Sequence, residues 1–423
     1  MRTNRVINLC FPLFLLIFAF GNILFGQKPS ATPRQEKLLN GLKVLVWNVP
    51  GSDKVSLKLR IHAGSAFDPQ DKEGVMKLLA ESFFPNAEAR NFFREELDGT
   101  LEVVCSYDYV QINASARSSD LITLLETVAQ AISNPDLSKE ATEALKKDLS
   151  ATLLEMEKDA ERSADRAVAR RLLGTFPYGR AEFGTTASIE KIDYADLRFA
   201  RERLFTSDNA TLAVKGAVDP ALVFRAARRY FGSWLKADKT VPSTFRQPDP
   251  PLEKAEVINT TLGPPLVRLA TRGVARNDPD VAAAEVLAQI LENRFKSRSA
   301  SGSFARNESH VLPGIFVVGM PGIAVSDTAP HEKDALNVPS FAQLLVNEVT
   351  AEELSLAGSQ VAARWRRRDQ VDQWLDFETF KTTPAKNIYT ALDALVLADV
   401  RRFASRITGQ PAAVIIYYPP QVN

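Results

Sequence analysis

The sequence predicts an α+β protein of two related domains, each a mostly antiparallel sheet flanked by helices. Strand-like and helix-like segments are mixed without the strict alternation that a doubly wound parallel sheet requires. A proline-rich stretch divides the chain, and the order of segments in the second half loosely repeats that of the first. A chain of 423 residues is also too long for one ordinary domain.

The dividing stretch is residues 236–254, which carry four prolines and no periodic apolar pattern. Such a composition is typical of a linker. We therefore expect an N-terminal domain over residues 28–235 and a C-terminal domain over residues 255–423.

The first half begins with a turn at Asn40-Gly41 and a strand over 42–47. Residues 55–62 alternate apolar and polar side chains, which predicts a strand with one packed face and makes His62 a polar-side strand residue. Further strands are expected at 100–105, 109–116 and 210–214, and helices at 72–84, 120–132, 138–173 and 220–231.

The second half shows the same kinds of segment. Strands are expected at 266–269, 314–319 and 412–418. Helices are expected at 278–291, 340–348 and 351–368, with one more within 391–407.

The N-terminus reads as a secretory signal peptide over residues 1–26. Arg2 and Arg5 precede an apolar run from Leu9 to Phe20, which is followed by Gly21 and Gly26 as alternative exit positions. The alternative is an uncleaved membrane anchor, but the run is short for a membrane span. The sequence therefore favours export to the periplasm or beyond, without stable membrane insertion after cleavage.

Charge and cysteine content narrow the functional classes. The formal net charge is +1, so the chain has no overall attraction to nucleic acid or acidic membranes. The clusters Arg228-Arg229 and Arg366–Arg368 are most simply solvated helix faces. After signal cleavage only Cys105 remains, so no internal disulfide can form and stability must come from a large core.

Six short motifs, in order, resemble the pitrilysin/insulinase family of zinc peptidases, which includes mitochondrial processing peptidase. They cover about 200 residues, and no single one is specific. The motifs are Leu38–Leu42, Gly64–Asp68, Ser106–Tyr109, Asn134-Pro135, Phe176–Arg180 with Phe183–Thr185, and Tyr230–Trp234.

The resemblance implies a zinc-binding helix at residues 74–81, where the family carries G-x-x-H-x-x-E-H. This chain has Lys77, Ala80 and Glu81 at the His, Glu and second His positions. In the family motif the two histidines reach one metal and the Glu activates its bound water. A lysine cation and an alanine supply neither function. We therefore expect no zinc site in this chain, and no catalytic residues.

Two interpretations of Lys77 and Glu81 remain at this stage. They form an ordinary i,i+4 ion pair on a helix, or that pair fills the space that a metal would have occupied. The resemblance also implies a third zinc ligand on a later helix. Glu155 is its nearest match and Glu157 the second, and either is expected to be a vestigial, solvated carboxylate.

The second half departs further from the family. The stretch that would form the glycine-rich loop reads Ile290 to Ser299, without glycine. Arg294 and Arg298 are candidates for a remnant substrate contact, with surface charge as the alternative. His310 and His331 lack the rest of any metal motif and are interpreted as non-ligands.

The resemblance implies a non-catalytic subunit that pairs with an active, zinc-bearing chain of the same family to form a peptide-binding chamber. Zinc would be held by the partner alone, and the ligand would be a peptide rather than nucleic acid. The alternative is a peptide-binding or scaffold homodimer without any peptidase role. An active peptidase with a rebuilt site is disfavoured because the general base is missing.

Overall fold

The computed structural model describes residues 32–237, 245–252, 254–298, 300–322 and 338–418. Met1–Thr32 and Pro33–Asn423 are separate units, and the second is described below. The expected signal peptide, His331 and part of the expected linker lie outside the described residues.

The first half of this unit contains a six-stranded sheet of order β1-β2-β6-β3-β5-β4. Only the β2–β6 pair is parallel. The strands are β1 (Arg34–Lys37), β2 (Lys43–Asn48), β3 (Lys54–Ile61), β4 (Leu101–Cys105), β5 (Val110–Arg117) and β6 (Ala210–Gly216).

Helices cover one face of this first sheet and bury a large apolar core against it. The α-helices are α1 (Val75–Glu81), α2 (Ala87–Glu95), α3 (Leu121–Ser133), α4 (Lys139–Met156), α5 (Ala160–Leu173), α6 (Thr186–Glu190), α7 (Tyr194–Leu204) and α8 (Pro220–Phe231). Short 3-10 turns occur at η1 (Ser65–Phe67), η2 (Ser118–Asp120), η3 (Pro177–Gly179) and η4 (Ser207–Asn209).

The second half contains a five-stranded sheet of order β7-β11-β8-β10-β9. Its strands are β7 (Glu256–Asn259), β8 (Leu266–Arg272), β9 (Phe304–Glu308), β10 (Ile315–Pro321) and β11 (Ala413–Tyr418). Its helices are α9 (Val281–Ser297), α10 (Phe341–Leu344), α11 (Ala351–Arg366), α12 (Gln370–Thr379), α13 (Ile388–Asp393) and α14 (Leu397–Thr408).

The two sheets share one topology. Strands β2, β6, β3, β5 and β4 correspond in order to β7, β11, β8, β10 and β9. In each sheet the first pair of this series is parallel and the remaining pairs are antiparallel. The predicted fold class, two related and mostly antiparallel sheets flanked by helices, is confirmed.

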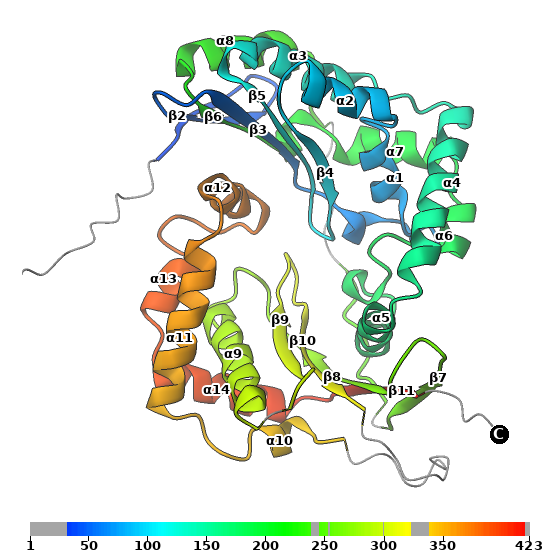
Figure 1. The fold of residues 1–423 in the computed structure, drawn as a ribbon, viewed down its shortest axis with the longest axis vertical. Coiled ribbons are helices and arrows are strands. Elements are labelled where there is room, and N and C mark those ends of the chain that lie inside the picture. Colours follow the sequence, from blue (N-terminus) through cyan, green and yellow to red (C-terminus); the bar gives the residue numbers. More distant parts are fainter. Residues whose placement is uncertain (1–31, 238–244, 253, 299, 323–337, 419–423) are drawn as a thin grey trace, which may run out of the picture. The chain divides into compact units, whose positions relative to one another are not determined.

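The halves exchange one helix each. Helix α5, from the first half, buries Ala164, Val168 and Leu172 against the second sheet. Helix α12, from the second half, packs against β6, and its Trp374 contacts Trp47 of β2 edge to face. Figure 1 shows α12 beside β2, β6 and β3, and α5 beside β8 and β11. Each sheet is thus covered on its second face by a helix from the other half.

This exchange corrects the prediction that β3 has a single packed face. The alternation is present, but the polar side chains of Lys58 and Arg60 lie beneath α12. His62, just after β3, contacts the hydroxyls of Thr211 at 2.9 Å and Thr379 at 3.0 Å. Burial lowers the pKa of His62.

Several predicted helices are shorter or divided. The expected helix over 138–173 divides into α4 and α5, because the Asp159 carboxylate accepts from the Glu161 and Arg162 amides and begins a new helix. The segment 391–407 likewise holds parts of α13 and α14, and α1 and α10 are shorter than expected. The sequence analysis missed β1, β7, β9, α2, α6, α7 and α12.

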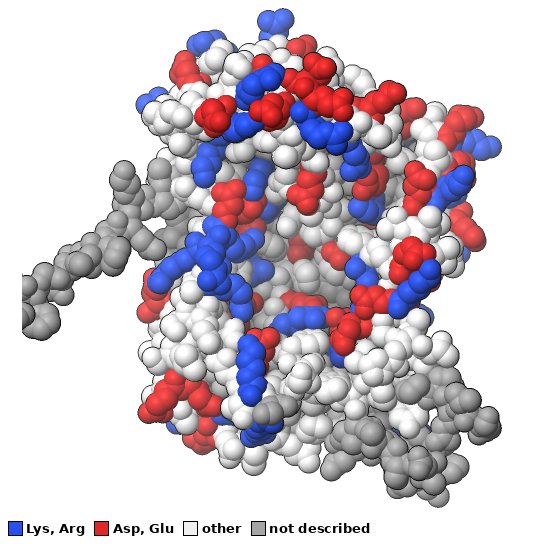
Figure 2. Space-filling view, in the orientation of Figure 1, with Lys and Arg blue, Asp and Glu red and all other residues white. Residues whose placement is uncertain are grey.

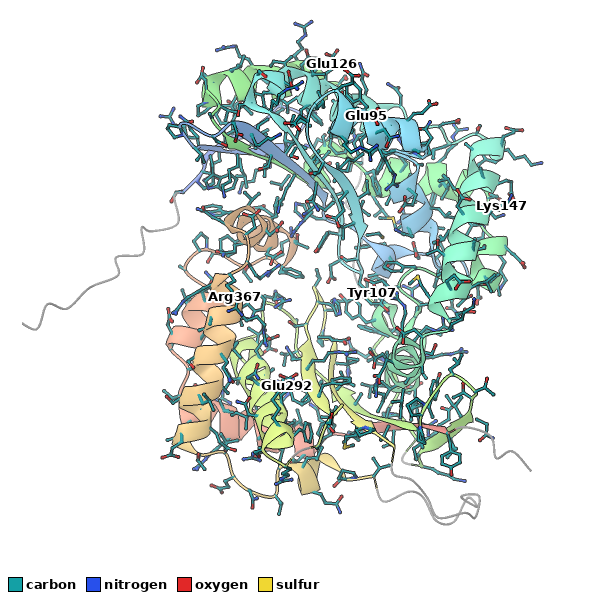
Figure 3. All side chains as sticks on the ribbon, viewed as in Figure 1. Glu95, Tyr107, Glu126, Lys147, Glu292 and Arg367 are labelled. Atoms are coloured by element: carbon teal, nitrogen blue, oxygen red, sulfur yellow. The ribbon has the colours of Figure 1, made fainter. Side chains whose placement is uncertain are left out.

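Charged side chains of both signs are interspersed over the face shown in Figure 2. Lys and Arg gather near the end of α11, where Figure 3 labels Arg367. Arg366 and Arg367 are exposed as expected. Arg368 is half-buried instead, and it contacts the Asp376 carboxylate at 2.6 Å.

Candidate functional site

Helix α1 is held in place by the loop that precedes it. The Asp68 carboxylate accepts hydrogen bonds from the backbone amides of Gly74 at 2.7 Å and Met76 at 2.8 Å. Burial raises the pKa of Asp68 to about 7, against the opposing effect of these two amides. Gly74 has a φ of 107°, and a Cβ there would lie 2.3 Å from the Ile189 Cδ1 atom. Glycine is therefore required at this helix start.

The two charged residues of the α1 motif, Lys77 and Glu81, belong to a charge network. Lys77 Nζ lies 2.7 Å from Glu81 Oε1, and Arg90 Nη2 lies 2.7 Å from Glu81 Oε2. Ala80 is fully buried. The Lys77 ammonium also lies 5.4 Å from the centre of the Phe183 ring. The ion pair anticipated from the sequence is therefore present, and Arg90 adds a second cation to it.

These residues do not fit a zinc ion. Zinc sites use neutral imidazole, thiolate or carboxylate donors. Here one position is an ammonium, one is a methyl group, and the carboxylate is already bound to two cations. Within the described residues, no group of three or more His, Cys, Asp or Glu side chains could hold a metal ion.

The two candidates for a vestigial third ligand differ in position. Glu155 is exposed, and its carboxylate lies 2.6 Å from Lys158 Nζ. Glu157, at the end of α4, lies 3.7 Å from Arg166 and lines a cavity of about 260 Å³. The structure thus brings the second candidate, and not the first, to a concave site.

Residues from both halves form this cavity, which is called the smaller cavity below. Its lining includes Tyr107 after β4, Arg162 of α5 and Glu182 from the segment after η3. The second half contributes Glu308 and His310. Figure 3 labels Tyr107 between the end of β4 and α5. Burial raises the pKa values of Glu182 and Tyr107 above their usual ranges.

His310 belongs to a polar network that the sequence reading missed. Its Nδ1 lies 2.8 Å from the Asp108 carboxylate, and its ring stacks on Tyr178 at 4.2 Å. The Tyr178 hydroxyl donates to Asp108 at 2.9 Å and accepts from the Leu312 amide at 3.0 Å. This network ties the β4–β5 turn, η3 and the loop after β9 together. Sequence spacing gave no signal for it, because its residues are about 70 to 200 positions apart.

A second and larger cavity of about 950 Å³ lies along the same helix. Its lining includes Arg166, Arg170 and Arg171 of α5, and Arg246 with three prolines from the segment 245–252. Glu157, Ser163 and Arg166 line both cavities, so the two are contiguous.

Arg294 and Arg298 lie elsewhere. The Arg294 guanidinium contacts the Glu353 carboxylate at 2.7 and 2.9 Å, which joins α9 to α11. Arg298 is exposed at the end of α9. Neither residue lines the two cavities. Their assignment as substrate contacts stays a prediction.

Strand β4 has a free edge. Among the described strands it pairs only with β5, so one row of its backbone groups has no strand partner. Edges of this kind accept extended peptides as an added strand.

No helix among the described residues is both long and apolar enough to cross a membrane.

Two domains of one peptidase family match the chain. The family described as Insulinase (Peptidase family M16) matches residues 43–186, and the Peptidase M16 inactive domain matches residues 191–356. The mitochondrial-processing peptidase subunit beta of Saccharomyces cerevisiae is 23% identical over 346 residues, covering 75% of this chain and 72% of that protein. An uncharacterised zinc protease of Rickettsia bellii is 23% identical, covering 48% of this chain and 51% of its own length.

Solved structures share the fold. A protease from Helicobacter pylori has a TM-score of 0.79 at 16% identity, covering 92% of this chain and all of that one. The periplasmic protease PqqL of Escherichia coli has a TM-score of 0.70 at 17% identity, covering 92% of this chain but only 48% of that one. With two family matches in sequence order and one shared architecture, the chain belongs to peptidase family M16, the pitrilysin/insulinase family.

Proposed function

We propose that this chain is the non-catalytic subunit of an M16 metallopeptidase. It pairs with a zinc-bearing chain of the same family and contributes a peptide-binding surface. The zinc ion belongs to the partner chain, and this chain carries out no hydrolysis by itself.

The state of helix α1 carries the proposal. Lys77, Glu81 and Arg90 form a closed charge network where the family places two histidines, and Ala80 offers no group that could take a proton from water. Peptide hydrolysis by a metallopeptidase needs an open metal position and a general base. These residues supply neither of them.

Peptide binding is supported by features that do not depend on a metal. The free edge of β4 can hydrogen-bond an extended backbone, and Tyr107, just beyond that strand, lines the smaller cavity. The two contiguous cavities along α5 provide concave surface for side chains.

Pairing is supported by the length of related proteins. This chain covers 92% of the first half of PqqL, but 48% of the whole PqqL chain. The yeast relative is itself named as a subunit. PqqL therefore carries a further region beyond the half that matches this chain, and we propose that a partner chain of the same family supplies its counterpart here.

Export is also part of the proposal. Basic residues, an apolar run and small residues follow one another over residues 1–26, which is the order of a secretory signal peptide. The assembly would therefore act in the periplasm or outside the cell.

The test is purification of the tagged chain from a native envelope extract, with identification of every co-purifying chain. A stoichiometric partner carrying H-x-x-E-H supports the proposal. Recovery of the chain only with itself contradicts it and favours the peptide-binding or scaffold homodimer. The matched control is a tagged chain with Lys77→Ala and Glu81→Ala, which should recover the same partner because α1 lies within this chain's own core.

A further inference from the structure

Helix α5 divides its side chains among three surfaces. Ala164, Val168 and Leu172 are buried against the second sheet. Glu161 and Asp165 both contact the Arg268 guanidinium. The remaining surface carries the arginine row, defined here as Arg162, Arg166 and Arg170, and all three of these residues are exposed.

The arginine row is poorly neutralised. Arg166 lies 3.7 Å from Glu157, which is long for an ion pair. Arg162 stacks on the Phe183 ring at 5.5 Å. For Arg162 and Arg170, no described carboxylate lies within ion-pair distance. Like charges four residues apart on a helix repel one another, so the row is unfavourable unless an anion lies over it.

The arginine row runs along both cavities. Arg162 and Arg166 line the smaller one, and Arg166 and Arg170 line the larger one. Most carboxylates in these cavities already have cationic partners. Asp165 contacts Arg268 and Arg306, Glu308 contacts Arg306, and Glu256 contacts Arg171. Six arginines and six carboxylates line the two cavities, so their formal charges balance overall. The positive charge is local to the arginine row, because most of these carboxylates are paired with other arginines.

The trough is defined here as the two contiguous cavities along α5. We propose that this trough binds an extended peptide with acidic side chains at every second position. Residues four apart on a helix are separated by about 6 Å along its axis. Residues two apart on an extended chain are separated by about 6.6 Å. Three alternate carboxylates would therefore fall in register with Arg162, Arg166 and Arg170.

The walls of the trough can contact the peptide side chains that lie between the acidic ones. Tyr107, Tyr178 and Phe183 line one end, and Phe176 with Pro248 and Pro250 lines the other. Phe176 and Tyr178 are buried, so the accessible rings are those of Tyr107, Phe183, Pro248 and Pro250. We expect side chains that pack on these rings, apolar or aromatic, at the intervening positions. The inference rests on the proposed peptide-binding role and names its substrate class.

The test uses fluorescently labelled nine-residue peptides and the purified full chain, with binding followed by anisotropy. One peptide carries Glu at three alternate positions among apolar residues. A second has the same composition with the three Glu residues adjacent, and a third carries Lys at the alternate positions. We expect the first to bind about tenfold more tightly than the third, and more tightly than the second, because only it places a carboxylate on each guanidinium.

Two variants sharpen the test. Arg162→Gln with Arg166→Gln and Arg170→Gln should abolish the preference for the alternating Glu peptide. Arg162→Glu with Arg166→Glu and Arg170→Glu should reverse it toward the Lys peptide. The matched control is Arg225→Gln with Arg229→Gln on α8, two exposed arginines at the same spacing that line neither cavity. It should bind as the unchanged chain does.

Equal binding of all three peptides overturns the inference while leaving the proposed function standing. The same holds if the adjacent and alternating Glu peptides bind alike. If no peptide binds and yet a zinc-bearing partner co-purifies, the trough is not a peptide site and the pairing still stands. If no peptide binds and no zinc-bearing partner co-purifies, both proposals fail.

Discussion

Arg60 and Arg268 occupy equivalent central strands of the two sheets. Each contacts two acidic residues that belong to the opposite half and lie one helical turn apart. Arg60 of β3 contacts Asp376 at 2.7 Å and Asp372 at 3.6 Å, both on α12. Arg268 of β8 contacts Asp165 at 2.6 Å and also Glu161, both on α5. Both arginine side chains are only 1% exposed. The internal duplication therefore extends from strand order to a buried ion-pair arrangement.

This arrangement predicts that removing a buried acid of α12 lowers the free energy of unfolding more than removing an exposed one. Asp376→Ala leaves the buried Arg60 without its close carboxylate, and we expect a loss of about 3–5 kcal/mol in the free energy of unfolding. Glu378→Ala, on the same helix, removes a half-exposed contact with Lys43 and should cost at most about 1 kcal/mol. Urea denaturation of both variants measures the difference. Equal costs would show that the buried pair does not fix α12 on the first sheet.

The polar network around Asp108 makes a second prediction. Tyr178→Phe removes the donor to Asp108 and the acceptor for the Leu312 amide, while the ring stays in place. We expect a loss of about 1–3 kcal/mol in unfolding free energy, because two buried polar groups lose a partner. Tyr194→Phe on α7, an exposed tyrosine, is the control and should be neutral. An unchanged stability for Tyr178→Phe would mean that water replaces the hydroxyl at no cost.

Asp68 gives a dependence of stability on pH. Its folded-state pKa of about 7 lies above the ordinary value of 3.8, so the folded state binds the proton more tightly than the unfolded state. The stability contributed by the protonated Asp68 carboxyl is fully present below about pH 4 and is lost as pH rises through 7. Its upper bound is about 4 kcal/mol. The stability of the unchanged chain relative to Asp68→Asn should therefore fall between pH 4 and pH 8. A rise over that range would show that the two amide hydrogen bonds outweigh burial.

Introducing histidines tests whether α1 can hold a zinc ion. Lys77→His with Glu81→His places two imidazoles on one face of the helix. We expect this variant to bind Zn²⁺ in calorimetry, while peptide cleavage stays absent because Ala80 cannot act as a base. Arg225→His with Arg229→His on α8 measures the affinity of an isolated histidine pair.

Comparison of these two variants then tests the position of Glu157. Tighter zinc binding at α1 than at α8, lost on adding Glu157→Gln but kept on adding Glu155→Gln, would identify Glu157 as the vestigial third ligand. Equal affinities at the two helices would show that no third ligand lies within reach of α1.

The sequence predicted the parts of the fold that local patterns determine. The alternation in β3 leaves a local signature, and the structure places that strand where it was predicted. The helix break at Asp159 is also local, but we overlooked the capping aspartate within a long periodic stretch. Strand β9 was missed because it is short and half-polar.

Other features depend on contacts that no local pattern specifies. An amphipathic α12 does not reveal which sheet it covers, so the burial of Arg60 could not be read from β3. His310 joins Asp108 only because the two halves pack together. The choice between Glu155 and Glu157 likewise depends on which side chain turns toward a cavity formed partly by the second half.

We propose that this chain has no zinc chemistry of its own and depends on a zinc-bearing partner for it. The most direct measurement is the zinc content of the purified complex and of this chain alone, by mass spectrometry of the metal, with peptide cleavage measured on the same samples. We expect one zinc ion per pair of chains, none in this chain alone, and cleavage only by the pair. One tightly bound zinc ion in this chain alone, with cleavage abolished by a chelator, would contradict this proposal.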